Sequence, residues 1–257
     1  MVNQVPRAPR TLVERDREDG HNRLWNDYFA DPPVFPPNLF RRRFRMRKHV
    51  FLRIVHTLEE RHQFFQQWQD TTGRFGASAL QKCTAALRLL AYGTATDSVD
   101  DYLRISASLA RDSLQHFVEG VVSYFSDDYL RRPNEEDMAR LLRDGERRGF
   151  PGMMGSIDCI HWRWKNCPLR LNTLAMEELF SRRANKPTLI LEAVASQDLL
   201  IWHASFGTPG RCNDINVLDR SPLFNDIFED RAPLVNYIVN GHQYNMGYYL
   251  TDGIYPT

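Results

Sequence analysis

Apolar residues recur at helical spacing through the first part of the chain. One apolar stripe with positions three and four apart contains Val50, Phe51, Ile54, Val55 and Leu58. Ser78 and Gln81 have the spacing of a capping box, which predicts that another helix begins there and runs to Gly93. Thr96 and Ser106 are placed to cap a short helix and a longer one. The pattern predicts an all-helical region.

Asn134 precedes three acidic residues, which favours one more helix, because acids are stabilised at the positive end of the helix dipole. We expect this helix to end near Gly149. The segment before the first helix, residues 1–40, is polar and broken by prolines, and it is interpreted as a flexible arm with little core of its own. The sequence therefore predicts an arm at 1–40 and a helical region at 41–149.

The pattern changes to strand-forming residues after residue 150. "MMGSIDCIHWRW" (153–164) predicts one strand, and "TLILEAVAS" (188–196) with "LLIWHASFG" (199–207) predicts a hairpin around a Gln-Asp turn. A helix beginning at Asp214 and a last strand, "YYLTDG" (248–253), follow. The order strand, strand, strand, helix, strand makes residues 150–257 a second domain, and the fold class α+β or α/β.

Composition restricts the function classes less than the pattern does. The 257 residues carry a net charge of only +1, but Arg41 to Lys48 places six cations in eight positions. The four cysteines are scattered, unlike a secreted disulfide framework, and no apolar run has the length of about 18 residues that a membrane span needs. We expect a soluble intracellular protein that has no membrane partner.

The helices between Leu80 and Phe125 have the spacing of a helix-turn-helix unit. Groove-reading side chains would lie near the start of its last helix, at Ser108, Arg111, Asp112 and Gln115. Phosphate contacts would come from the preceding cationic run, in particular from Arg41, Arg42, Arg43 and Lys48. The alternatives are an ordinary helical bundle and a solvated helix face.

Two aspartates occur in strand contexts, Asp158 within "GSIDCIHW" and Asp252 at the end of "YYLTDG". A buried carboxylate in a strand needs a basic partner, hydrogen bonds or a metal. If the first and fourth strands are neighbours, the two acids meet at one edge of the sheet and are suited to Mg²⁺ or Mn²⁺. This arrangement indicates a ribonuclease-H-like metal nuclease core. The alternative is that each acid has a separate structural role: Asp158 would accept a hydrogen bond from a neighbouring backbone N–H, and Asp252 would open an Asx-turn before Gly253.

Two further acids are weaker candidates. Glu192 falls inside an apolar strand, where it is expected to need a partner, either a cation or a shared metal. Asp214 in "GRCNDINVLD" is interpreted first as a helix cap and second as a residue at the rim of the site.

Several long motifs resemble transposases of the PIF/Harbinger superfamily, especially its plant branch. They are "GMMGSIDCIHWRWKNCP", "KPTLILEAVAS", "NDINVLDRSPLF" and "YYLTDGIYP", with the upstream "LQKCTAALRLLAYGTATDSVDDYLRI" and "FVEGVVSYFSDDYLRRP". The similarity extends from about Phe40 to the end of the sequence.

The resemblance implies a DDE nuclease with a ribonuclease-H-like fold, in which two aspartates and a glutamate hold two divalent metals and act on DNA. The first aspartate corresponds to Asp158. Asp252 is our choice for the second, and Asp214 is its rival. The resemblance also implies a Myb-like DNA-binding partner protein, work in the nucleus, and a homo-oligomer that acts on two DNA ends.

Two departures from the family pattern affect this expectation. The stretch "LRLNTLAMEELFSRRANKPT" replaces a glycine-rich connection after the first aspartate. The third acid normally lies on a helix a few dozen residues beyond Asp252, where this sequence has five residues and none of them is acidic. We therefore expect an incomplete catalytic domain that is inactive as this fragment. The alternatives are a domesticated or decayed transposase that binds DNA or protein, and a remnant without activity.

Overall fold

The computed structural model describes residues 14–163, 188–225, 229 and 234–253. The chain divides into two compact units, Met1–Phe125 and Ser126–Thr257. Helices make up the first unit and a mixed sheet with helices makes up the second, so the fold class is α+β. None of the helices in these described ranges is long and apolar enough to cross a membrane.

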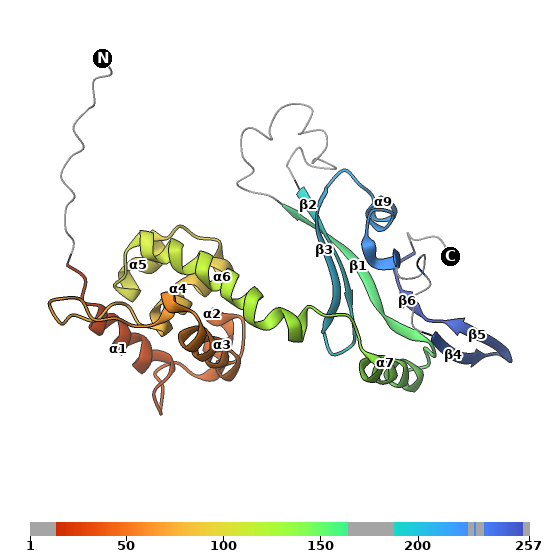
Figure 1. Cartoon of the computed structure of the whole chain (residues 1–257), viewed down its shortest axis with the longest axis horizontal. Helices are drawn as coiled ribbons and strands as arrows, with labels where there is room; N and C mark the ends of the chain where they lie inside the picture. The colour runs from red at the N-terminus through yellow and green to blue at the C-terminus, as the bar shows by residue number, and fades with distance from the viewer. Residues whose placement is uncertain (1–13, 164–187, 226–228, 230–233, 254–257) are drawn as a thin grey trace, which may run out of the picture. The chain divides into compact units, whose positions relative to one another are not determined.

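The described part of the first unit contains a short 3-10 helix, η1 (Gln63–Phe65), and six α-helices. The α-helices in chain order are α1 (Arg17–Tyr28), α2 (Pro37–Phe44), α3 (Lys48–Arg61), α4 (Ala79–Tyr92), α5 (Asp97–Leu103) and α6 (Ala107–Tyr129) (Figure 1). The boundary between the two units falls within α6.

An aromatic cluster fills the core of the first unit. Tyr28 and Phe29 at the end of α1 pack against Phe40 and Phe44 of α2, and the last two rings stack with centroids 4.1 Å apart. The flexible arm expected over residues 1–40 is therefore not found over residues 17–40, where α1 and α2 belong to the core. The reason is that a few large aromatic side chains bury enough apolar area to fix helices whose other positions are polar.

Gln81 and Gly20 allow α1 to pack closely against α4 and α5. The capping box of Ser78 and Gln81 is confirmed, and Gln81 also donates from Nε2 to the carbonyls of Arg17 and Leu103, at 2.9 Å each. A Cβ atom at Gly20 would lie 2.6 Å from the Leu103 carbonyl oxygen, so only glycine permits this approach of α1 to α5.

After the last residues of α6, the second unit continues with α7 (Glu135–Arg147), whose predicted Asn134 cap is confirmed as a capping box with Asp137. This helix packs on β1 (Met153–Arg163). The unit boundary therefore lies near residue 125, and the predicted boundary near 150 is wrong. Helical periodicity shows that α7 forms, but does not show which unit its apolar side covers.

A four-stranded sheet with the order β3-β2-β1-β6 forms the centre of the second unit. β2 (Thr188–Ala195) and β3 (Ile201–Pro209) form the predicted hairpin, and β1 is antiparallel to β2. β6 (Tyr248–Leu250) lies parallel to β1, which confirms that the first strand and the last predicted strand are neighbours. The other elements among the described residues are η3 (Pro222–Phe224) and, labelled in Figure 1, α9 (Asp214–Leu218) and the β4–β5 hairpin (Leu234–Val239 and His242–Met246).

The β1–β2 register assigns alternate residues to the two faces of this sheet. Ile157 is paired with Val194 and Cys159 with Glu192, and these residues share one face. That face is the buried one, because Ile157, Val194 and Glu192 are all buried. Asp158 is paired with Ala193 and belongs to the opposite face.

Candidate functional site

Asp158 lies within β1, and Asp252 follows the end of β6, the strand that pairs with β1 in parallel. Ser156 of β1 is paired with Leu250, the last residue of β6, and each aspartate lies two residues further along the sequence. The two aspartates therefore belong to the same end of the β1–β6 pair, although the strand pairing itself stops at Leu250.

Asp158 is exposed, contrary to the expectation of a buried carboxylate that needs compensation. Its Oδ1 accepts a hydrogen bond from the Cys159 backbone N–H at 2.8 Å. Its cross-strand neighbour on β2 is Ala193, which is paired in turn with Ala204 of β3. Because these neighbours are small, the carboxylate is open to solvent or to a ligand on this face.

Exposed apolar side chains lie further along the open face. Ile160 and Trp162 follow Asp158 at alternate positions of β1, and the Trp162 ring lies 5.7 Å from that of Phe206. Trp164 and Cys167 of the same motif, and the departing stretch that follows them, lie outside the described residues.

Asp214 lies on the other face of the sheet. Its Oδ1 is buried, has no hydrogen-bond partner among the described residues, and lies 3.8 Å from Nε2 of His161. It is not the cap of α9, because Asn213 takes that position and accepts from the Asn216 N–H. The structure therefore separates Asp214 from Asp158 and brings it to His161, a contact that the sequence did not suggest.

Glu192 is fully buried on the same covered face. Neither of its carboxylate oxygens has a hydrogen bond of normal geometry within the described ranges. Burial raises the pKa of Glu192, and the Ser221 hydroxyl lowers it to a smaller extent. Ser221 also lies 3.1 Å from Nε2 of His203, whose pKa is lowered chiefly by burial. The Ser221 hydroxyl is thus a polar group that the structure places beside Glu192.

Two carboxylates at one sheet edge would suit a hard cation that takes only one or two ligands from the protein. Mg²⁺ is commonly bound by one or two carboxylates and keeps waters for substrate phosphates. Asp158 and Asp252, both exposed, are the two carboxylates at this end of the β1–β6 pair. Over the described residues no cluster of three or more His, Cys, Asp or Glu side chains is placed to hold a metal.

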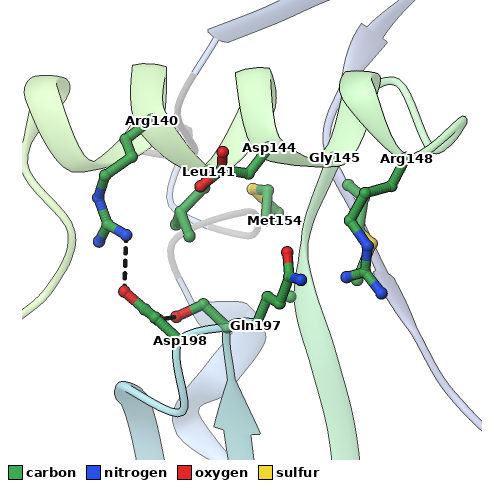
Figure 2. A pocket seen from close by; sticks show the side chains of 11 residues that line it. Arg140, Leu141, Asp144, Gly145, Arg148, Met154, Gln197 and Asp198 are labelled. Carbon is green, nitrogen blue, oxygen red and sulfur yellow. Dashed lines mark hydrogen bonds and ion pairs between the residues drawn. The ribbon is translucent and has the colours of Figure 1, made fainter.

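A small cavity lies between α7 and the β2–β3 turn, with a volume of about 30 Å³. Figure 2 shows Arg140 extending from α7 to Asp198, with Nη1 2.7 Å from Oδ2. Asp198 also accepts from the Ser196 hydroxyl, and these two contacts, with Ser196 the stronger, lower its pKa. The cavity is far smaller than the roughly 300 Å³ at which ligand pockets begin, so it is too small for a substrate. The Arg140–Asp198 ion pair holds the turn against α7.

The helix-turn-helix candidates are exposed at the start of α6. Ser108, Arg111 and Gln115 are all exposed, and Gln115 donates to Glu119 at 2.9 Å. The tight turn before α6 is present, with Arg104 in the left-handed conformation.

The cationic run does not form one solvated face. Arg43 lies over the Phe35 ring at 4.1 Å and donates to the Tyr28 hydroxyl. Lys48 donates to the Phe29 carbonyl at 3.0 Å. Arg41 and Arg42 are exposed, so only part of the run is available to a partner.

A known protein family matches the stretch of the chain that contains this sheet. The family described as plant transposon protein matches residues 127–257, just over half of the chain. The chain belongs to this family. A second family, described as a domain of unknown function, matches residues 20–59. No curated protein and no solved structure matches the chain.

Proposed function

We propose that the second unit is a DDE-type nuclease or transposase domain with a ribonuclease-H-like core. The observation that carries this proposal is the parallel β1–β6 pair, which has Asp158 on β1 and Asp252 two residues beyond the end of β6. The strand order β3-β2-β1-β6, with only β6 parallel to β1, supports it. Membership in a plant transposon family supports DNA as the substrate and the nucleus as the location.

Asp158 and Asp252 would hold a divalent cation, Mg²⁺ or Mn²⁺, at this edge. Such an ion polarises a phosphodiester and lowers the pKa of a bound water. The residues themselves position the ion: the Cys159 N–H fixes one oxygen of Asp158, and the alanines beside it leave room for a phosphate. The placement of Asp214 on the covered face favours Asp252 over Asp214 as the second acid.

We also propose that the described carboxylates bind a divalent cation without catalysing DNA cleavage. Affinity for a hard cation depends on the number of charged ligands. Two-metal chemistry usually needs more than two carboxylate ligands. We therefore propose that the described residues bind a cation and DNA but do not cleave it alone.

A plasmid-nicking assay tests this part of the proposal. The full chain, incubated with supercoiled plasmid and Mn²⁺, is expected to leave the plasmid intact. Mn²⁺-dependent nicking that disappears in Asp158→Asn would overturn the inactive form and establish an active nuclease. Nicking that persists in Asp158→Asn would contradict the site itself.

The second candidate function is DNA binding by the first unit without catalysis, favoured by the exposed Ser108, Arg111 and Gln115 behind a tight turn. Arg111→Ala is then expected to weaken duplex binding and to reduce its salt dependence. Unchanged binding at low salt would exclude this function. We also propose that the protein works with a Myb-like DNA-binding partner protein and forms a homo-oligomer.

A further inference from the structure

We propose that a groove of the first unit binds an acidic peptide with an apolar anchor residue. The groove lies between the α1–α2 connection and the start of α3, and its volume is about 940 Å³. This is within the range of ligand pockets, which is roughly 300 to 1,000 Å³. It is independent of the aspartates of the second unit and is not part of the function proposed above.

The floor of the groove is apolar. Buried Tyr28 and Phe40 form its base, and half-buried Phe35 and Leu52 form its sides with Pro33. The base is rigid, because Tyr28 and Phe40 belong to the aromatic cluster, with their rings 6.0 Å apart. A preformed apolar floor binds one or two apolar side chains without a large ordering cost.

The rim of the groove is cationic. Arg41, Arg47 and Lys48 face a single acidic lining residue, Asp31. Lys48 is fixed by its hydrogen bond to the Phe29 carbonyl. Arg41 and Arg47 are exposed, and neither forms an ion pair with another residue of the described segments. This excess of positive charge complements a negatively charged partner.

The N-termini of α2 and α3 add to the positive potential of the groove. The N-terminal residues of α2 and α3 line the groove, and neither helix has a side-chain cap or an acid in its first turn. The positive end of the helix dipole favours carboxylates, and α3 also offers backbone N–H groups there, whereas Pro36 and Pro37 at the start of α2 have none. Within the described residues no carboxylate lies in the first turn of either helix, so the partner can supply it.

An acidic peptide fits this groove better than duplex DNA does. A duplex presents a convex, polar phosphate backbone that leaves an apolar floor unfilled, whereas a peptide places apolar side chains inward and acids at the rim. Every lining residue lies within residues 20–59, the stretch matched by the second family. The groove is thus contained in one short segment of the chain.

Fluorescence anisotropy on the full chain tests the proposal. The probe is a fluorescein-labelled peptide of Asp and Glu residues around one Trp and one Leu, and the comparison peptide has Lys in place of every acid. Only the acidic peptide is expected to bind. Arg41→Glu and Arg47→Glu are each expected to weaken binding about tenfold or more. Leu52→Ala tests the apolar floor and is expected to weaken it without changing the charge.

The matched control is Arg42→Glu, which makes the same charge change on α2 at an exposed residue outside the groove lining. It is expected to weaken the affinity much less than Arg41→Glu does, because Arg42 does not line the groove. Equal weakening by Arg42→Glu, equal binding of the lysine peptide, or no binding of the acidic peptide would overturn the proposal. Displacement of the peptide by duplex DNA, with DNA binding lost in Arg41→Glu, would assign the groove to nucleic acid instead.

Discussion

Gln81 shows how one side chain can join three helices. Its Oε1 accepts from the Ser78 N–H at 2.9 Å, and its Nε2 donates to two carbonyls from α1 and α5. The Ser78–Gln81 spacing predicted the cap, because that contact is local. The carbonyls of Arg17 and Leu103 could not be predicted, since they depend on the packing of distant segments.

Replacing Gln81 with methionine of similar size is expected to destabilise the first unit by about 2 to 4 kcal/mol. The change leaves the Ser78 N–H, the buried Leu103 carbonyl and the partly buried Arg17 carbonyl without their partner. Chemical denaturation monitored by circular dichroism measures the loss. Gln115→Met, at an exposed glutamine of α6, is the control and is expected to be neutral. Equal stability of both variants would contradict the assigned role.

Glu192 makes the stability of the second unit depend on pH. Burial raises its pKa above the ordinary value of 4.5, so the folded protein holds this proton more tightly than the unfolded chain does. The free energy of unfolding therefore falls as the pH rises from the unfolded pKa through the folded pKa. The contribution is fully present only below the unfolded value.

Glu192→Gln removes this titration and is expected to be more stable than the parent chain at pH 8, on the order of 1 kcal/mol. The advantage should disappear near pH 4, where Glu192 is neutral in both states. Urea unfolding across this pH range gives the difference. Glu60→Gln, at an exposed acid, serves as the reference and should show no such trend. A pH-independent difference for Glu192→Gln would exclude the assignment.

At the scale of elements, the parallel pair β1–β6 positions the candidate site. The strand order along the chain predicted this neighbour relation, and the register confirms it. The exposure of Asp158 was not predicted, because period-two alternation separates two faces but does not identify the covered one. The chain segment around α9 decides this by packing on the face of Glu192 and His203.

The contact between α7 and the β2–β3 turn is a second feature at the scale of elements. The Arg140 guanidinium lies 6.0 Å from the Trp202 ring centre, besides its ion pair with Asp198. Both charged partners are more than one-third exposed, so the ion pair contributes little by itself.

Arg140→Ala is expected to lower the free energy of opening of this turn by at most about 1 kcal/mol. Hydrogen exchange at the Leu199 amide, which donates to the Ser196 carbonyl at 2.9 Å, reports the opening. Arg143→Ala, at an exposed arginine of α7, is the matched control. Exchange that is equally fast in both variants would show that the ion pair does not hold the turn.

At the scale of the whole molecule, the two units have separate cores. Phe44 is fully buried in the first unit, and Val217 is buried in the second. The sequence indicated a helical first part and a strand-rich second part. Its boundary was misplaced because α7 has the periodicity of the first part and packs in the second.

Phe44→Ala is expected to cost about 3 to 5 kcal/mol, since it leaves a cavity in the aromatic cluster. The loss of amide protection should be confined to α1–α6, with β1–β3 unchanged in hydrogen-exchange mass spectrometry. Val217→Ala should give the reverse pattern. Loss of protection in both units from either substitution would contradict the division into separate cores.

The most direct test of the central claim is Mn²⁺ binding to the full chain, measured by isothermal titration calorimetry. Asp158→Asn and Asp252→Asn are each expected to weaken the affinity about tenfold or more, because each removes a charged ligand. Asp214→Asn, on the opposite face, is expected to leave the affinity unchanged. An unchanged affinity in Asp158→Asn, or an equal loss in Asp214→Asn, would contradict a metal site formed by Asp158 and Asp252.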